Sequence, residues 1–354
     1  YSYDNIGNRK TAREPAGELA YAANGLNQYT GIEESGEAPF VPTYDASGNQ
    51  TLIKTSTGVW TVVYNAANRA VSFTSRNGNT IIECGYDYQG RRYMKKVTQN
   101  GTVASHERYL YRGYLQIAAL DMLDNRNVLR TLLWDPLEPM ATRPLALVQG
   151  ASLYCYGVDF NKNVSEVFDK QGTIAAAYDY SPYGTDTRTG RLVQPVQWSG
   201  EMHDEELALV YYNYRYYHPA DGRWINRDPI AEEGGWNLYG FVDNNPIDSF
   251  DINGRSTLHG AAGQAIVAAF RTGNLTSLRN LARLGKDQRV CDALKTLEST
   301  ARTLISKSRG GRVNREFPSQ YYEKAYHQII KEANAGSATA KKALKLIRDL
   351  RFSK

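Results

Sequence analysis

Cysteine is scarce in this chain of 354 residues, and long apolar runs are missing. The three cysteines, at positions 84, 155 and 291, are far apart, so the sequence indicates neither a disulfide framework nor a cysteine metal site. No apolar run approaches the roughly 20 residues that a membrane-spanning helix needs. The opening residues, YSYDNIGNRK, show no signal-peptide pattern and start inside a repeated motif, so we expect further segments to precede them.

The charge of the chain is divided unevenly between its two parts. Residues 1–255 contain 23 Lys and Arg against 30 Asp and Glu, a net charge of −7. Residues 256–354 contain 19 against 7, a net charge of +12. So much positive charge in 99 residues favours a polyanionic partner, and nucleic acid is the first candidate. A basic helical domain that binds an acidic protein is the alternative.

The first half of the chain repeats a tyrosine-rich motif about every 20 residues. The motif reads YDNIGNR, YAANGLN, YDASGNQ, YNAANRA and YDYQGRR, and it begins at Tyr3, Tyr21, Tyr44, Tyr64 and Tyr86. Each copy combines a short strand of Tyr and β-branched residues with an Asn/Gly turn, a pattern typical of β-hairpins. A period of this length predicts stacked units that form one long, coiling antiparallel sheet.

After Ser256 the strand signals stop, and the pattern changes to that of helices. A first apolar stripe, at helical spacing, consists of Leu294, Leu297, Ala301 and Leu304. A second helix is expected from about Pro318 to Gly336, with Tyr322, Tyr326, Ile329, Ile330 and Ala333 on one face. Ser337 is placed to cap a third helix. The tail is therefore predicted to be one mainly α domain of about 100 residues.

The run RWINRDPIAEEGGWNLYGFVDNNPIDSFDINGR, residues 223–255, contains the residues with the most definite chemistry. Asp228 and Asp251 are separated by Gly, Asn and Pro turn formers, so the chain can double back and bring them together. Adjacent carboxylates share a proton, which allows one to act as base on a water and the other as acid on a peptide carbonyl. We expect Arg227 to orient one of them. The alternative is that these are turn residues, and Asp243 and Asp248 are nearby substitutes.

Together with the repeats, the motifs YDYSPYGT, YYNYRYYHPADGRWINRDPI and GGWNLYGFVDNNPIDSFDINGR resemble the Rhs/YD-repeat proteins and their terminal core region. That family includes polymorphic toxins and the C subunits of insecticidal toxin complexes. The resemblance covers residues 1–255. It implies a spiralling β-shell over residues 1–210 that forms a hollow cocoon, and a core plug over residues 211–255. The variable C-terminal toxin domain, residues 256–354, would be enclosed.

The resemblance also implies that the core is an aspartic peptidase that cuts its own chain after a D-x-x-G-x motif. Here that motif is residues 251–255, so the cut is expected between Arg255 and Ser256. Ile252 and Arg255 stand where many relatives have Pro and Leu. Export from a bacterium, action of the effector in the cytoplasm of a target cell, and a cognate immunity protein are further implications. The missing N-terminal segments would complete the shell and carry the delivery domains.

The polar residues of the tail are compatible with a metal-independent nuclease, and a ribonuclease is the favoured class. The loop residues Arg309, Arg312 and Arg315 surround two glycines and can bind phosphate. Glu316 and His327 can exchange the protons that cleavage through the 2′-hydroxyl of RNA requires, and the tyrosines near them, Tyr321, Tyr322 and Tyr326, can stack a base. No cofactor or metal is expected, since His203 and His218 have no partners at ligand spacing.

Other interpretations of the tail stay open. The arginines can form a solvated basic face, with the tyrosines packed in a core. The effector can belong to another class, an ADP-ribosyltransferase or a membrane-active domain. The whole protein can also be a non-catalytic surface or adhesion scaffold with an uncut tail.

Overall fold

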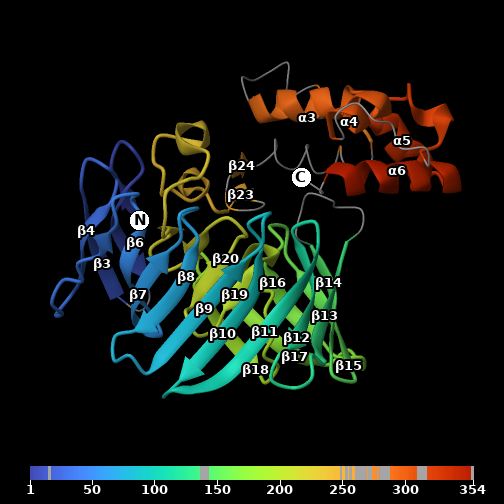
Figure 1. The fold of residues 1–354 in the computed structure, drawn as a ribbon. Coiled ribbons are helices and arrows are strands. Elements are labelled where there is room, and N and C mark those ends of the chain that lie inside the picture. The colour runs from blue at the N-terminus through green and yellow to red at the C-terminus, as the bar shows by residue number, and fades with distance from the viewer. Residues whose placement is uncertain are drawn as a thin grey trace. The chain divides into compact units, whose positions relative to one another are not determined.

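The structure, a computed structural model, divides the chain into two compact units (Figure 1). It describes residues 1–14, 17–135, 143–247, 249–251, 254, 257–259, 269, 273–276, 279, 288–308 and 317–351. The first unit takes in residues 1–111, 116–133 and 144–257, and the second takes in residues 112–115, 134–143 and 258–354. The first unit is mostly antiparallel β-sheet, and the helices of the second lie near the C-terminus of the chain.

The repeats form two antiparallel sheets in the described part of the chain, and each strand pairs with its neighbour in the sequence. The four-stranded sheet contains β1 (Ser2–Tyr3), β2 (Arg9–Glu14), β3 (Gly17–Ala23) and β4 (Tyr29–Glu34). The fourteen-stranded sheet contains β5 (Thr43–Tyr44), β6 (Gln50–Thr55), β7 (Gly58–Tyr64), β8 (Ala70–Ser75), β9 (Thr80–Tyr86), β10 (Arg92–Gln99), β11 (Thr102–Arg112), β12 (Leu115–Asp121), β13 (Val128–Trp134), β14 (Pro144–Gln149), β15 (Ser152–Val158), β16 (Val164–Phe168), β17 (Ile174–Tyr180) and β18 (Asp186–Gly190). The prediction of antiparallel strands in consecutive hairpins is confirmed, but the strands form two sheets rather than the one long sheet that was predicted.

The tyrosine of a repeat ties its strand to the preceding one. The Tyr64 hydroxyl at the end of β7 donates to the carbonyl of Gln50 in β6, at 2.9 Å. The Tyr86 hydroxyl of β9 donates in the same way to Ala70 of β8, at 2.8 Å. Burial raises the pKa of both phenols. Each ring thus fills space on the sheet while its hydroxyl satisfies a backbone carbonyl, which explains why Tyr recurs at this position.

The Asp or Asn after this tyrosine shapes the turn of the repeat. At Asp45, one carboxylate oxygen accepts hydrogen bonds from the N–H groups of Ser47 and Asn49, each at 2.9 Å. Gly48 in the same turn has a φ of 84°, a conformation that favours glycine. Equivalent bonds form at Asp4, Asn65, Asp87 and Asp169. The Y-D-x-x-G spelling of the repeat is therefore the sequence of an Asx turn.

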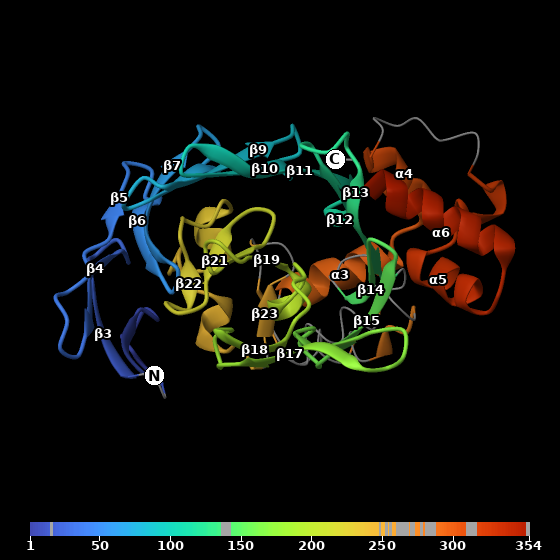
Figure 2. The same ribbon diagram turned by 90° about the horizontal axis from the view of Figure 1, so that it is seen from below.

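A small four-stranded sheet, rich in aromatic residues, forms the core region of the first unit. It contains β19 (Met202–Asp204), β20 (Leu209–Tyr211), β21 (Tyr216–His218) and β22 (Arg223–Trp224). Figure 2 shows the strands of the fourteen-stranded sheet curving around it. Its buried cluster contains Tyr183, Trp198, Val210, Tyr212, Tyr217, Trp224, Phe241 and Val242. Trp236, in the segment that follows this sheet, is 82% exposed.

The second unit contains α3 (Gln288–Glu298), α4 (Ala301–Ser308), α5 (Tyr326–Asn334) and α6 (Ala338–Arg351). Leu297 and Ala301 of the first predicted stripe are fully buried, as are Ile329 and Ile330 of the second. The first predicted helix is interrupted where the Ser299 hydroxyl donates to the carbonyl four residues earlier. The second begins at Tyr326 rather than near Pro318. The predicted cap of α6 is confirmed, because the N–H of Ala340 donates to the Ser337 hydroxyl at 3.2 Å.

The same described residues contain neither a membrane-spanning helix nor a cluster of metal ligands. Among them, no helix is long and apolar enough to cross a lipid bilayer. No group of three or more His, Cys, Asp and Glu side chains in this part of the chain is arranged to hold a metal ion. The three cysteines are free thiols, with Cys84 buried and the other two exposed.

Candidate active site

Asp228 and Asp251 are each fixed by hydrogen bonds within their own loop. One carboxylate oxygen of Asp228 accepts from the N–H of Ile230 at 2.9 Å, four residues after β22. Asp251 is the last residue of β23 (Ser249–Asp251), and one of its oxygens accepts from the N–H of Gly254 at 2.8 Å. In each case the second oxygen is left to face other partners. Both side chains therefore have a defined orientation.

The second oxygens of the two carboxylates meet at the same nitrogen atom of Arg215. The Nη2 of Arg215 lies 2.8 Å from Oδ2 of Asp228 and 3.7 Å from Oδ2 of Asp251. The side chains of Arg215 and Asp251 are each 2% exposed, and that of Asp228 is 8% exposed. The chain thus doubles back between the two aspartates, as the turn formers between them suggested. A buried cation holds the pair.

Arg215 also contacts the backbone beside the predicted cut. Its Nε donates to the carbonyl of Gly254 at 2.6 Å, and its guanidinium lies over the ring of Trp224, 4.0 Å from the centroid. Gly254 has a φ of 79°, and a Cβ there would lie 3.0 Å from the carbonyl oxygen of Tyr212. A single guanidinium therefore joins both carboxylates to the segment that precedes Arg255.

The surroundings of Asp228 favour its protonated form. Burial raises the pKa of Asp228, and the negative charge of Asp251 adds to this effect. The positive charge of Arg215 acts in the opposite direction but does not outweigh burial. The space for the carboxylate is narrow, because a Cβ on Gly234 would lie 2.6 Å from Oδ2 of Asp228. The site thus combines a carboxyl group whose pKa is raised with a second carboxyl group beside the same guanidinium.

Arg227, the cation expected to orient an aspartate, lies elsewhere. Arg227 is exposed. A Cβ added at Gly48 would lie 2.5 Å from the Cδ of Arg227, so this side chain packs against a turn of the repeat sheet. Arg215 takes the position expected for Arg227. A signal for Arg215 was present in the sequence, where it is the one charge within the aromatic run YYNYRYY. Burial of that run predicts a buried arginine, which requires carboxylate partners.

The other acidic and histidine candidates of the core differ in burial and in partners. Asp243 is exposed, and Asp248 lies outside the described residues. Nδ1 of His218 lies 2.7 Å from Oδ2 of Asp221, and both residues are buried. His203 is partly buried, and burial lowers its pKa below the ordinary value of 6.5. The predicted cleavage residues, Arg255 and Ser256, lie outside the described part of the chain.

In the second unit, the environment of His327 favours an imidazole without charge. Burial, and then the positive charges of Lys331 and Arg279, lower the pKa of His327 below 6.5. Arg279 is held by Glu298, with Nη2 2.6 Å from Oε1. His327 is partly exposed on α5, so its ring can reach a ligand. Arg309, Arg312, Arg315 and Glu316, the other predicted residues of this site, lie outside the described residues.

The tyrosines predicted to stack a base differ in accessibility. Tyr326 is 1% exposed and Tyr321 is 2% exposed, so both rings are packed inside the second unit. The base-stacking prediction for these two is wrong, because neither presents a free ring face. Tyr322 is partly exposed and packs against Phe317, with ring centroids 5.1 Å apart. Of the three, only Tyr322 remains a candidate for base stacking.

The chain is similar in sequence to several curated proteins, although no protein-family model matches it. It is 27% identical over 268 residues to the tRNA3(Ser)-specific nuclease WapA of Bacillus spizizenii, which covers 72% of this chain and 11% of the relative. It is 34% identical over 96 residues to toxin subunit YenC2 of Yersinia entomophaga, covering 25% and 10% of the two chains. It is 38% identical over 85 residues to double-stranded DNA deaminase toxin A of Burkholderia cenocepacia, a match that covers 22% of this chain and 6% of the relative.

The chain spans about a tenth of the length of the WapA relative. Among solved structures, the crystal structure of TcdB2-TccC3 has a TM-score of 0.49 and 21% identity, and covers 67% of this chain and 14% of that one. The sequence similarity extends to two proteins that are named as toxins, and this chain has the same tyrosine-rich repeats that first suggested the resemblance. These similarities support the resemblance of the chain to Rhs/YD-repeat toxins.

Proposed function

We propose that this protein is a self-cleaving toxin container, in which the core cuts the chain between Arg255 and Ser256 and frees a basic effector. The observation that supports this most directly is the arrangement around Arg215. That guanidinium lies 2.8 Å from Asp228, 3.7 Å from Asp251 and 2.6 Å from the carbonyl oxygen of Gly254. Two carboxyl groups held next to a fixed stretch of substrate backbone are what an aspartic peptidase acting on its own chain requires.

The cut follows from the different states of the two carboxyl groups. Asp251 acts as the base: it takes a proton from a water, whose oxygen attacks the carbonyl carbon of Arg255. Asp228, with its raised pKa, donates its proton to the carbonyl oxygen. When the tetrahedral intermediate collapses, Asp228 regains this proton and the C–N bond breaks. The Ser256 nitrogen receives the proton that Asp251 had taken, and Arg255 becomes a C-terminal carboxylate.

The charge division supports a shell that retains its cargo after the cut. Residues 1–255 carry −7 and residues 256–354 carry +12, so the two pieces attract each other. We expect the cleaved protein to elute from a sizing column as one species at low salt, while a denaturing gel shows two chains. Separate elution of the two pieces under those native conditions would rule out a retaining shell. A hollow cocoon formed by the repeat sheet is part of this proposal.

The effector is proposed to be a nuclease that acts on RNA in a target cell. His327 is partly exposed and its pKa is lowered, so the neutral ring can take the proton of a 2′-hydroxyl. Arg279 and Lys331 provide positive charge beside it for a phosphate. The WapA relatives are named tRNA nucleases, which favours RNA over other polyanions. An acidic immunity protein would fit the same basic surface, and the effector would reach its target by export from a bacterium.

The nuclease proposal is tested by producing residues 256–354 inside bacterial cells. We expect growth to stop and cellular RNA to fragment, and we expect His327→Ala to reduce RNA cleavage by about 100-fold or more. His259→Ala, at the segment's second histidine, is the control and should retain activity. Intact RNA in growing cells would contradict the proposal. Leakage of dye from liposomes would then favour a membrane-active effector.

A further inference from the structure

Arg215 is part of a short turn whose backbone is closely constrained. The turn, residues 212–215, joins β20 to β21, and the N–H of Tyr212 donates to the carbonyl of Arg215 at 2.9 Å. Asn213 in this turn has a φ of 61°, a left-handed conformation that needs support from its surroundings. The turn lies against Gly254, whose Cβ position is 3.0 Å from the carbonyl oxygen of Tyr212. Any displacement of the turn therefore moves Arg215 relative to the aspartates and Gly254.

Arg69, from the repeat sheet, holds the middle of this turn. Its Nη1 donates to the carbonyl of Asn213 at 2.6 Å, and its guanidinium lies 4.4 Å from the ring centroid of Tyr214. Gly90 leaves room for it, since a Cβ at that glycine would lie 2.4 Å from Nη2 of Arg69. Arg69 immediately precedes β8, so the contact joins the fourteen-stranded sheet directly to the turn that contains Arg215.

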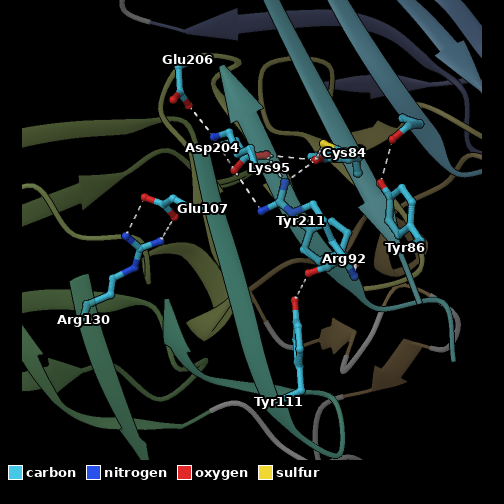
Figure 3. A network of polar contacts seen from close by, with 12 residues as sticks. Cys84, Tyr86, Arg92, Lys95, Glu107, Tyr111, Arg130, Asp204, Glu206 and Tyr211 are labelled. Atoms are coloured by element: carbon cyan, nitrogen blue, oxygen red, sulfur yellow. Dashed lines mark hydrogen bonds and ion pairs between the residues drawn. The ribbon is translucent and has the colours of Figure 1, made fainter. Parts of the chain in front are cut away.

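Arg92, the first residue of β10, holds both ends of the same turn. Its backbone N–H donates to the hydroxyl of Tyr211, and its Nη1 donates to the hydroxyl of Tyr216. Nη1 also lies 2.5 Å from Oδ2 of Asp204, to which the Tyr216 hydroxyl donates at 3.0 Å. Figure 3 shows Arg92 between Tyr211 and Asp204. Nζ of Lys95 donates to Oδ1 of the same carboxylate. The residues on either side of the turn are thus bonded to one buried arginine.

The buried charges of this network are balanced and hydrogen-bonded. Arg92 is 2% exposed and Asp204 is 3% exposed. Although burial opposes it, Arg92 and Lys95 hold the pKa of Asp204 well below its usual range. Lys95 in turn contacts Glu206, with Nζ 2.6 Å from Oε2. Paired charges without access to water fix geometry strongly, since removal of one partner leaves the other buried and unpaired.

We propose that Arg69 and Arg92 are positioning residues for self-cleavage, through which the repeat sheet sets the place of Arg215 and so of the catalytic aspartates. This inference rests on the proposed self-cleavage. Both arginines act on Asp228 and Asp251 through the turn of residues 212–215. The chain is then cut only after the core region has docked on a completed sheet. Cleavage thereby reports that the shell has been built, before the effector is freed within it.

The test compares Arg69→Gln with a matched arginine of another repeat. Arg9 follows Asn8 in its repeat as Arg69 follows Asn68, and its Nη1 donates to the carbonyl of Ala220 in the core region at 2.9 Å. Each full chain is made by cell-free synthesis, synthesis is stopped, and the uncut fraction is followed on denaturing gels. We expect Arg69→Gln to slow cleavage by about 100-fold and Arg9→Gln to change it by less than about threefold. Arg69→Lys should be intermediate, because it retains the charge without the planar fork.

Two further readouts separate positioning from a loss of folding. The melting temperatures of Arg69→Gln and Arg9→Gln are compared in an uncut Asp251→Asn background and should fall by similar amounts. In Arg69→Gln, a displaced Arg215 lowers the pKa of Asp228 less than in the parent. Asp228 then keeps its catalytic proton to a higher pH, so the cleavage rate should fall at a higher pH than in the parent. Equal slowing by the Arg9 and Arg69 variants, or parent-like cleavage in Arg69→Gln, would overturn the inference. A parent chain that stays uncut would instead overturn the proposed function.

Discussion

A chain in which Arg215 is replaced by Met should remain uncut. The guanidinium is almost fully buried and contacts Asp228, Asp251 and the carbonyl of Gly254. Without it, two carboxylates share a site with little water and no positive charge, so both tend to take up protons and neither acts as base. The carbonyl of Gly254, one residue before the attacked carbonyl of Arg255, also loses its donor. We expect cleavage to slow on the order of 1,000-fold or more.

The matched control for this change is Arg227→Met. Arg227 is twelve positions along, exposed, and packed against a turn of the repeat sheet, so its loss should leave the cleavage rate within about twofold of the parent. Loss of a buried charge partner costs about 3–5 kcal/mol of folding free energy, so the melting temperature of Arg215→Met must be measured as well. Arg215→Lys keeps the buried positive charge, so it is a second variant that is less exposed to loss of folding. Cutting at the parent rate in a folded Arg215→Met protein would contradict the account.

The second large effect is the loss of cleavage in Asp228→Asn, and it follows from the pH dependence expected of the parent. In the parent, Asp228 must be protonated to act as the acid, and burial raises its pKa above the ordinary value of 3.8. The cleavage rate should therefore fall as the pH rises through this raised pKa. An asparagine side chain has no carboxyl proton to donate at any pH, so cleavage should be lost at every pH.

The measurement is the rate of loss of uncut chain in buffers from acid to neutral pH, with Asp243→Asn as the control. Asp243 is an exposed aspartate of the same core region, and its replacement should leave the pH profile unchanged. An Asp228→Asn chain that is still cut, with the pH profile of the parent, would remove Asp228 from the mechanism. The peptidase assignment would then require another acid.

The sequence predicted those parts of the site that depend on local chain chemistry. The turn formers between Asp228 and Asp251 predict that the chain doubles back, and the two carboxylates do share one partner. Which arginine they share was not predictable from spacing. Arg227 is adjacent to Asp228 in the sequence, but its side chain lies on the outside of the loop. Arg215 comes from a different hairpin, so only the tertiary packing of aromatic residues brings it to the pair.

The fold shows the same division between local and long-range information. Tyr and Asx turns at regular spacing predict hairpins in sequence order, which the structure contains. The pairing register shifts near the ends of several strands, as between Val63 and Tyr64, and such bulges bend a sheet. Their effect on curvature cannot be derived from the period alone. In the second unit, the apolar stripe that predicts a helix also includes Tyr326, and periodicity cannot distinguish a packed tyrosine from one that binds a base.

The most direct test of the central claim is the intact mass of freshly purified, denatured protein. The account predicts two chains, residues 1–255 and residues 256–354, in equal amounts. The position of the break matters, because the Asp228–Pro229 bond is chemically sensitive to acid and would give a break 27 residues earlier. Two masses that meet between Arg255 and Ser256 would establish a self-cleaving container. A single chain of 39.7 kDa would contradict it.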